Sequence, residues 1–161
     1  MESQKRHKMS IFLKRQAKDL IRDITSLGSL SFYLITSLIF LLLNNYTIFR
    51  KLAIGLVLIY VVVIPIRTFY FKHRPEKYEY KSYIERLDAS SFPSLHAART
   101  AYMCLTLIEF FNENLISLII VIVSLAVFYS RIHLKKHDIL DISGGAIVGG
   151  LIYFLVSYIG H

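Results

Sequence analysis

The chain has 161 residues, of which 55% are apolar and only 19% are charged. One small core cannot bury so much apolar surface, so the composition argues against an ordinary water-soluble domain. Nineteen Lys and Arg against eleven Asp and Glu give a net charge of +8. The basic residues form short islands between long apolar runs, which indicates a membrane protein and argues against nucleic acid as a partner. A single cysteine, Cys104, excludes an internal disulfide.

The first 26 residues predict a basic amphipathic helix that lies on the membrane surface. Apolar residues recur there at helical spacing, with basic residues between them. The apolar set is Leu13, Ala17, Leu20, Ile21 and Ile24, and the basic set is Lys14, Arg15, Lys18 and Arg22. The simpler alternative is a basic anchor with no further role. Residues 27–161 then form a separate membrane domain.

Five apolar runs within that domain are candidate transmembrane helices. They cover residues 27–43, 52–66, 93–111, 114–130 and 142–161. The second run is short, but its helix can continue to Tyr70 if Lys51 extends its charged end to the membrane surface. We therefore expect an all-α polytopic bundle of about five transmembrane helices.

A polar island over residues 72–91 separates the second run from the third. Apolar and aromatic residues alternate there with charged residues. The apolar and aromatic set is Tyr78, Tyr80, Tyr83, Ile84 and Leu87, and the charged set is Lys77, Lys81, Glu85 and Arg86. The pattern fits either a short helix in the headgroup layer or a solvated loop.

Three polar clusters lie at the ends of the runs, where a membrane tolerates polar residues that pair or have a function. The first is Arg67, six residues and then Arg74-Pro75; the second is the segment 91–96, Ser-Phe-Pro-Ser-Leu-His; and the third is Ser130-Arg131, five residues, His137, three residues and Asp141. With five spans, all three clusters reach the same end of the bundle. Single residues of these kinds are common at span ends, but three clusters on one side predict a shared site.

The first two clusters suit an anion. Arginine presents a planar set of donors that matches phosphate oxygens. In the second cluster, Pro93 fits the first turn of a helix and Ser91 is the expected cap. Ser94, Leu95 and His96 would then offer free N–H groups at a helix N-terminus, where anions bind.

The third cluster supplies a nucleophile. His137 and Asp141 are four residues apart and share one face of a helix. Asp141 can accept a hydrogen bond from one imidazole nitrogen, which leaves the lone pair of the other nitrogen free to attack. His137 must be neutral for this step. Nearby arginines lower its pKa and Asp141 raises it, and the sequence leaves that balance open.

These motifs resemble the type 2 phosphatidic acid phosphatase (PAP2) superfamily, which also includes glucose-6-phosphatases and vanadium haloperoxidases. The family pattern is Lys-x6-Arg-Pro, then Pro-Ser-Gly-His, then Ser-Arg-x5-His-x3-Asp. Here Arg67 stands for the lysine and Leu95 for the glycine, whereas the third motif is complete. The resemblance covers about residues 50–155. Leu95 keeps the backbone N–H, but its side chain must point away from the pocket or narrow it.

The resemblance implies a mechanism. His137 attacks phosphorus and becomes phosphohistidine, Asp141 orients His137, and His96 protonates the leaving oxygen and then activates water. The phosphate oxygens would be held by Arg67, Arg74, Ser94, Arg131 and the amide of Leu95. We expect no metal and no other cofactor, because the arginines can stabilise the negative charge and no carboxylate cluster suits a divalent ion.

The expected substrate is a lipid phosphate or diphosphate, since a site at a span end receives a headgroup while the tails remain among membrane lipids. Among these lipids we favour polyprenyl diphosphate, because compact membrane members of the family often act on it. The alternatives are a phosphatase of soluble sugar-phosphate type and a degenerate member that binds lipid phosphates or scaffolds partners. A haloperoxidase is not expected, because those relatives are larger and soluble. The sequence leaves the oligomeric state open.

The expected location is the plasma membrane of a prokaryote. Sixteen of the nineteen Lys and Arg lie on the side of the motifs, whereas Arg50 and Lys51 lie on the other side. The positive-inside rule then predicts a cytoplasmic site, although many membrane relatives are thought to work on the other face. In the last run, Gly145 with Gly149 and Ala146 with Gly150 are spaced to allow close helix packing.

Overall fold

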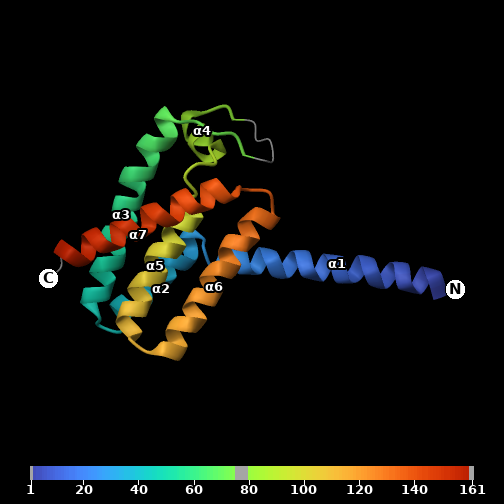
Figure 1. The fold of residues 1–161 in the computed structure, drawn as a ribbon, viewed down its shortest axis with the longest axis horizontal. Coiled ribbons are helices and arrows are strands. Elements are labelled where there is room, and N and C mark those ends of the chain that lie inside the picture. The colour runs from blue at the N-terminus through green and yellow to red at the C-terminus, as the bar shows by residue number, and fades with distance from the viewer. Residues whose placement is uncertain (1, 75–79, 160–161) are drawn as a thin grey trace.

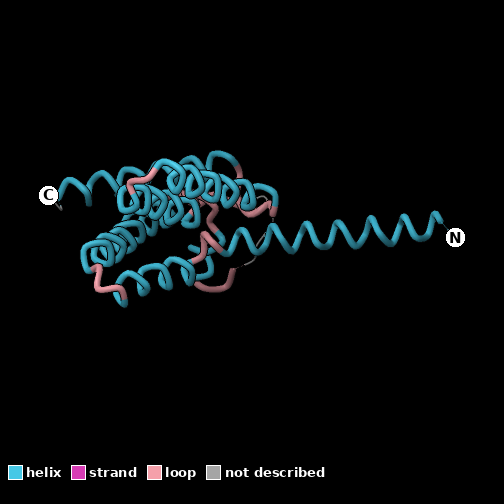
Figure 2. Tube along the Cα trace, turned by 90° about the horizontal axis from the view of Figure 1, so that it is seen from below, coloured by secondary structure: helices cyan, strands magenta, loops and turns pink. Residues whose placement is uncertain are grey.

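A computed structural model describes residues 2–74 and 80–159 of the chain. The described residues form seven α-helices (Figure 1). The helices are α1 (Glu2–Ser26), α2 (Leu30–Leu42), α3 (Tyr46–Phe69), α4 (Tyr83–Ala89), α5 (Leu95–Phe111), α6 (Asn114–His133) and α7 (Ile139–Ile159). Short loops join most of them (Figure 2). The expected all-α bundle is confirmed.

Three helices are long and apolar enough to cross a membrane alone, namely α3, α6 and α7. The second half of α1 and α2 would make a fourth span if the pair, bent by 49°, is taken as one broken span. The protein is therefore an integral membrane protein, but the count is below the five expected. Helix α2 has only 13 residues, about 20 Å, against a hydrocarbon core of about 30 Å. Helix α5 has 17 residues and packs against α3, α6 and α7.

Helices α5 and α7 form the tightest contact of the bundle. A Cβ atom placed on Gly145 would lie 2.3 Å from the carbonyl oxygen of Ser94, and one on Gly149 would lie 2.3 Å from that of Ala98. The expected pairing of Gly145 with Gly149 therefore corresponds to a real close approach. Gly150 has no atom within 4 Å of such a Cβ, so the second small-residue pair does not serve this contact.

The start of α5 differs from the expected one. The helix begins at Leu95 and its cap is Ser94, whose hydroxyl accepts a hydrogen bond from the amide of Ala97 at 3.4 Å. Pro93 precedes the helix, and Ser91 lies three residues before the cap. Ser91 instead bonds to the segment after α3, where its amide donates to the carbonyl of Lys72 at 2.8 Å.

The polar island contains a short helix, α4, which is the first of the two alternatives. Ser82 caps it by accepting from the amide of Glu85, and Glu85 accepts in return from the amide of Lys81. The island's Lys77 and Tyr78, like Pro75 of the first motif, lie outside the described residues.

Helix α1 extends away from the bundle (Figure 1). Its last turn contacts the end of α6, where the hydroxyls of Thr25 and Ser130 are 2.5 Å apart. Leu13 and Leu20 are exposed. Its placement on a membrane surface stays a prediction.

Candidate active site

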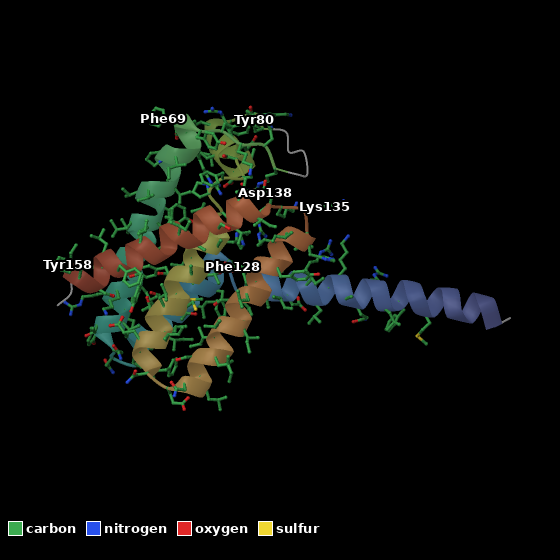
Figure 3. All side chains as sticks on the ribbon, in the orientation of Figure 1. Phe69, Tyr80, Phe128, Lys135, Asp138 and Tyr158 are labelled. Carbon is green, nitrogen blue, oxygen red and sulfur yellow. The ribbon has the colours of Figure 1, made fainter. Side chains whose placement is uncertain are left out.

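The turn between α6 and α7 positions His137. The carbonyl oxygen of Arg131, in the last turn of α6, accepts hydrogen bonds from the amides of Lys136 and His137. Asp138 then caps α7: its carboxylate accepts from the amide of Asp141 at 2.9 Å, and the Asp141 carboxylate accepts from the amide of Asp138 at 3.0 Å. This reciprocal cap fixes both aspartates relative to the histidine just before them. Figure 3 shows Asp138 and Lys135 at this turn.

The imidazole of His137 lies over Asp141. Its Nδ1 atom is 3.6 Å from Oδ2 of Asp141, which is longer than a hydrogen bond, and both side chains are buried. Burial lowers the pKa of His137 below its usual 6.5, and although Asp141 opposes this effect, Arg131 and Arg74 reinforce it. In the balance left open by the sequence, desolvation and the arginines together outweigh Asp141 and favour the neutral imidazole.

Asp141 has two further partners that the sequence analysis did not assign. Its Oδ1 atom accepts from Nζ of Lys72 at 2.8 Å and from the hydroxyl of Ser91 at 3.3 Å. Lys72 also donates to Asp138 at 2.6 Å. The Asp-x-x-Asp spacing before an apolar run could have indicated the helix cap. No sequence signal pointed to Lys72, because its contact depends on how the loop after α3 folds back.

The N-terminus of α5 lies against the start of α7. The amide of Ser94 donates to the carbonyl of Asp141 at 3.0 Å, so it is not free for an anion. The amides of Leu95 and His96 begin the helix and have no intrahelical acceptor there. The Leu95 side chain packs against the hydrophobic core, which is the arrangement that leaves the pocket open.

His96 lies half-buried at this helix start. Burial, reinforced by the positive charges of Arg131 and Arg99, lowers the pKa of His96 to about 2, so these groups favour the neutral imidazole. Residue Gly28, between α1 and α2, packs beside its ring: a Cβ there would lie 3.3 Å from Cδ2 of His96.

The three motif arginines reach the same region from different elements. Arg67, in the last turn of α3, is 3% exposed and donates to the carbonyls of Leu87 at 2.9 Å and Pro93 at 2.9 and 3.3 Å. Arg74 donates to the carbonyl of Asp88. Arg131 is buried, and its Nε atom has no hydrogen-bond partner within residues 2–74 and 80–159. A buried donor without an acceptor is rare in proteins and indicates a missing ligand or water.

The structure therefore brings all eight predicted site residues to one end of the bundle, with differences in detail. Arg67 bonds to main-chain carbonyls, and Ser94 serves as a helix cap.

A groove of about 490 Å³ reaches His137 from the outside. It is lined by Ile132, Lys135, His137, Asp138, Ile139 and Leu140. Within residues 2–74 and 80–159, no group of three His, Cys, Asp or Glu side chains is placed to hold a metal ion.

Part of the sequence and the overall fold are similar to those of known proteins. The chain is 36% identical over 70 residues to a lipid A 4'-phosphatase of Bacteroides thetaiotaomicron, a match that takes in 44% of this chain and 31% of that protein. The chain thus matches about a third of the length of this relative. The crystal structure of Aquifex aeolicus LpxE superposes with a TM-score of 0.72 at 25% identity, over 89% of this chain and 86% of that one.

A second solved structure shows the same fold. It is the transmembrane PAP2-type phosphatidylglycerolphosphate phosphatase of Bacillus subtilis, with a TM-score of 0.62 at 21% identity, over 89% of this chain and 76% of that one. Residues 48–161 match the sequence pattern of the PAP2 superfamily. This match takes in all three polar clusters and most of the chain, and the protein therefore belongs to the PAP2 superfamily.

Proposed function

We propose that this protein is a membrane phosphatase that hydrolyses a lipid phosphate through a phosphohistidine intermediate and without a metal ion. The observation that carries the proposal is the convergence of His137 with its Asp141 partner, His96 and three arginines at one end of the bundle. A nucleophile, a second imidazole for proton transfer and an excess of buried positive charge are the parts that phosphoryl transfer needs.

In the first step, the lone pair of His137 Nε2 attacks phosphorus. The N–P bond forms as the ester P–O bond breaks, and His96 gives a proton to the departing oxygen. Because burial and the nearby arginines lower the pKa of His96, the negative charge of the bound phosphate must raise that pKa for His96 to carry the proton. In the second step, His96 takes a proton from water, the water oxygen bonds to phosphorus and the N–P bond breaks. Phosphate leaves, and His137 and His96 return to their starting states. Asp141 stabilises the positive charge that His137 carries in between.

Phosphate binding falls to Arg67, Arg74, Arg131, Ser94 and the Leu95 amide in this proposal. Arg131 supports this assignment, because its buried Nε has no acceptor among the described residues and a phosphate oxygen would provide one. A guanidinium has five N–H donors, and the carbonyl contacts of Arg67 use three of them. Arg67 therefore supports the segment before α5 and keeps donors for the anion.

The groove beside His137 supports a lipid substrate. Ile132, Ile139 and Leu140 give it an apolar wall that is exposed in the isolated chain and that a membrane would cover. A tail along this wall would leave the phosphate at the imidazole. Polyprenyl diphosphate remains one candidate, and similarity to a lipid A 4'-phosphatase adds a phosphate monoester of lipid A type. The basic residues on the side of the site favour the cytoplasmic face.

Phosphate release from a panel of substrates tests the proposal. The purified protein in lipid or detergent is offered polyprenyl diphosphate, lipid A, phosphatidylglycerol phosphate and a soluble sugar phosphate. We expect turnover of at least one lipid and a loss of at least about 10³-fold in His137→Ala, since removing a nucleophile leaves little catalysis. His133→Ala is the matched control, because His133 is an exposed histidine that matches no motif position.

Other outcomes separate the alternatives. Equal rates on lipid and soluble esters would indicate a phosphatase of the sugar-phosphate type. Equal hydrolysis by the wild type and His137→Ala, or tight binding without hydrolysis, would indicate a degenerate lipid-phosphate binder.

A further inference from the structure

Lys72 is one of the six unspecified residues between Arg67 and Arg74 of the first motif, and it contacts the residue that orients the nucleophile. We propose that Lys72 is a positioning residue, which holds the Asp141 carboxylate in place beneath His137 and offsets its negative charge. This inference rests on the proposed function, because it assigns Lys72 a role in the reaction of His137.

The backbone of Lys72 is fastened beside the site. Its carbonyl oxygen accepts from the amide of Ser91 at 2.8 Å, and a β-bridge joins the next residue, His73, to Ser90. These bonds tie the segment after α3 to the segment before α5. Lys72 therefore extends toward α7 from a fixed base.

The ammonium group of Lys72 lies between two carboxylates of α7's first turn. It is 2.6 Å from Asp138 Oδ2 and 2.8 Å from Asp141 Oδ1. The Lys72 side chain is 25% exposed and that of Asp141 is fully buried, so this contact is not an ordinary surface ion pair. Although partial burial lowers the pKa of Lys72, its hydrogen bonds to both aspartates raise it overall, which keeps the ammonium charged.

The two oxygens of Asp141 have different partners. Oδ1 accepts from Lys72 and Ser91, whereas Oδ2 accepts from the Asp138 amide and faces Nδ1 of His137. Lys72 thus prevents the carboxylate from rotating and leaves Oδ2 for the imidazole. A carboxylate that orients a histidine is most effective when its own geometry is fixed by a further shell of bonds.

Lys72 also affects the charge balance around His137. Asp141 of α7, Arg131 of α6, Arg74 of the segment after α3 and His96 of α5 act electrostatically on this imidazole. The other charged groups near it are Lys72, bonded to both aspartates, Asp138 at the start of α7 and Lys135 in the adjoining turn. Without the ammonium, the negative charge of Asp141 would stabilise the imidazolium more strongly. The neutral, nucleophilic form of His137 would then require a higher pH.

The test is the pH profile of kcat/KM for Lys72→Met between pH 4 and 9. Methionine keeps the length of the stem and removes the charge. We expect the acidic limb to move up by about 0.5 to 1 pH unit, which is about a 3- to 10-fold loss of rate on that limb. Lys72→Arg keeps the charge and should restore the wild-type profile. Lys81→Met, a change at an exposed lysine of the same polar island, should leave it unchanged.

Asp138→Asn provides a second variant that is expected to fold, because asparagine is also a strong helix cap. It removes a negative charge near His137, so its acidic limb should move down, opposite to that of Lys72→Met. A loss of rate that is equal at every pH in Lys72→Met would overturn the proposal and leave Lys72 a structural residue. An unshifted limb in either variant would overturn it as well. An inactive wild type would instead refute the proposed function.

Discussion

Gly145 is the residue at which packing and catalysis are most directly connected. It lies one turn after Asp141 in α7 and faces the carbonyl of Ser94, whose amide is bonded to Asp141. In Gly145→Ala, the new Cβ would lie 2.3 Å from that oxygen and 2.9 Å from Cβ of Ala97. Ordinary contacts begin at 3.4 Å, so α5 and α7 must separate by about 1 Å.

The expected cost follows from that displacement. Overpacking of this kind costs about 1–3 kcal/mol, and each kcal/mol lowers the melting temperature by about 2–4 °C in a chain of this size. The same movement shifts the Leu95 and His96 amides relative to His137. A misplacement of about 1 Å reduces catalysis by about 10²-fold. We therefore expect Gly145→Ala to lose both stability and activity.

Thermal melting in detergent and phosphate release under saturating substrate measure the two effects. Gly149→Ala should lose similar stability but less activity, because its Cβ would meet Ala98 O, farther along α5 from the site. Gly150→Ala is the matched control, since a Cβ there meets nothing within 4 Å, and alanine favours the helix by about 0.5–1 kcal/mol. Equal melting temperatures and activities for Gly145→Ala and Gly150→Ala would refute the reasoning.

Three further predictions concern the reaction and the topology. Because burial lowers the pKa of His137, the neutral nucleophile persists below pH 6.5, and the acidic limb of the pH profile should lie below that value. An acidic limb above pH 7 in the wild type would contradict this. Activity should survive EDTA, and abolition by EDTA with recovery on adding Mg²⁺ would count against arginine-based charge stabilisation. The membrane face of the site can be tested with two cysteine variants made in a Cys104→Ala background, namely Asn114→Cys at the start of α6 and Lys81→Cys in the polar island. If the site is cytoplasmic, an impermeant maleimide added to intact cells should label Asn114→Cys and spare Lys81→Cys; the reverse pattern would place the site outside.

The order of the helices, and the gathering of the motif residues at one end of the bundle, could be predicted from the sequence because both depend on spacing along the chain. Long apolar runs predict helices, and an odd or even number of crossings decides which ends meet. The four-residue spacing of His137 and Asp141 already places them on one side of a helix start. These relations involve residues that are near in sequence or are joined by helices of known length.

The details that could not be predicted depend on contacts between distant segments. Ser91 and Ser94 are equally good caps by residue type, and the bond from Ser91 to Lys72 decides between them. Arg67 carries a charge suited to phosphate, but the fold also places three main-chain carbonyl contacts around it. Of the five predicted runs, those at residues 27–43 and 93–111 form helices of 13 and 17 residues, and the apolar pattern alone did not show how short these helices would be.

The same bonds that satisfy the buried arginines also hold the walls of the site. A guanidinium buried at the end of a membrane bundle is costly unless its donors are paired. Arg67 pairs with the carbonyls of Leu87 and Pro93 and so joins α3 to α4 and to the segment before α5, whereas Arg131 keeps a buried Nε without an acceptor. Arg67 thus contributes mainly to the shape of the pocket and Arg131 mainly to its affinity for an anion. Replacing the first should disturb the fold, and replacing the second should weaken phosphate binding while the fold persists.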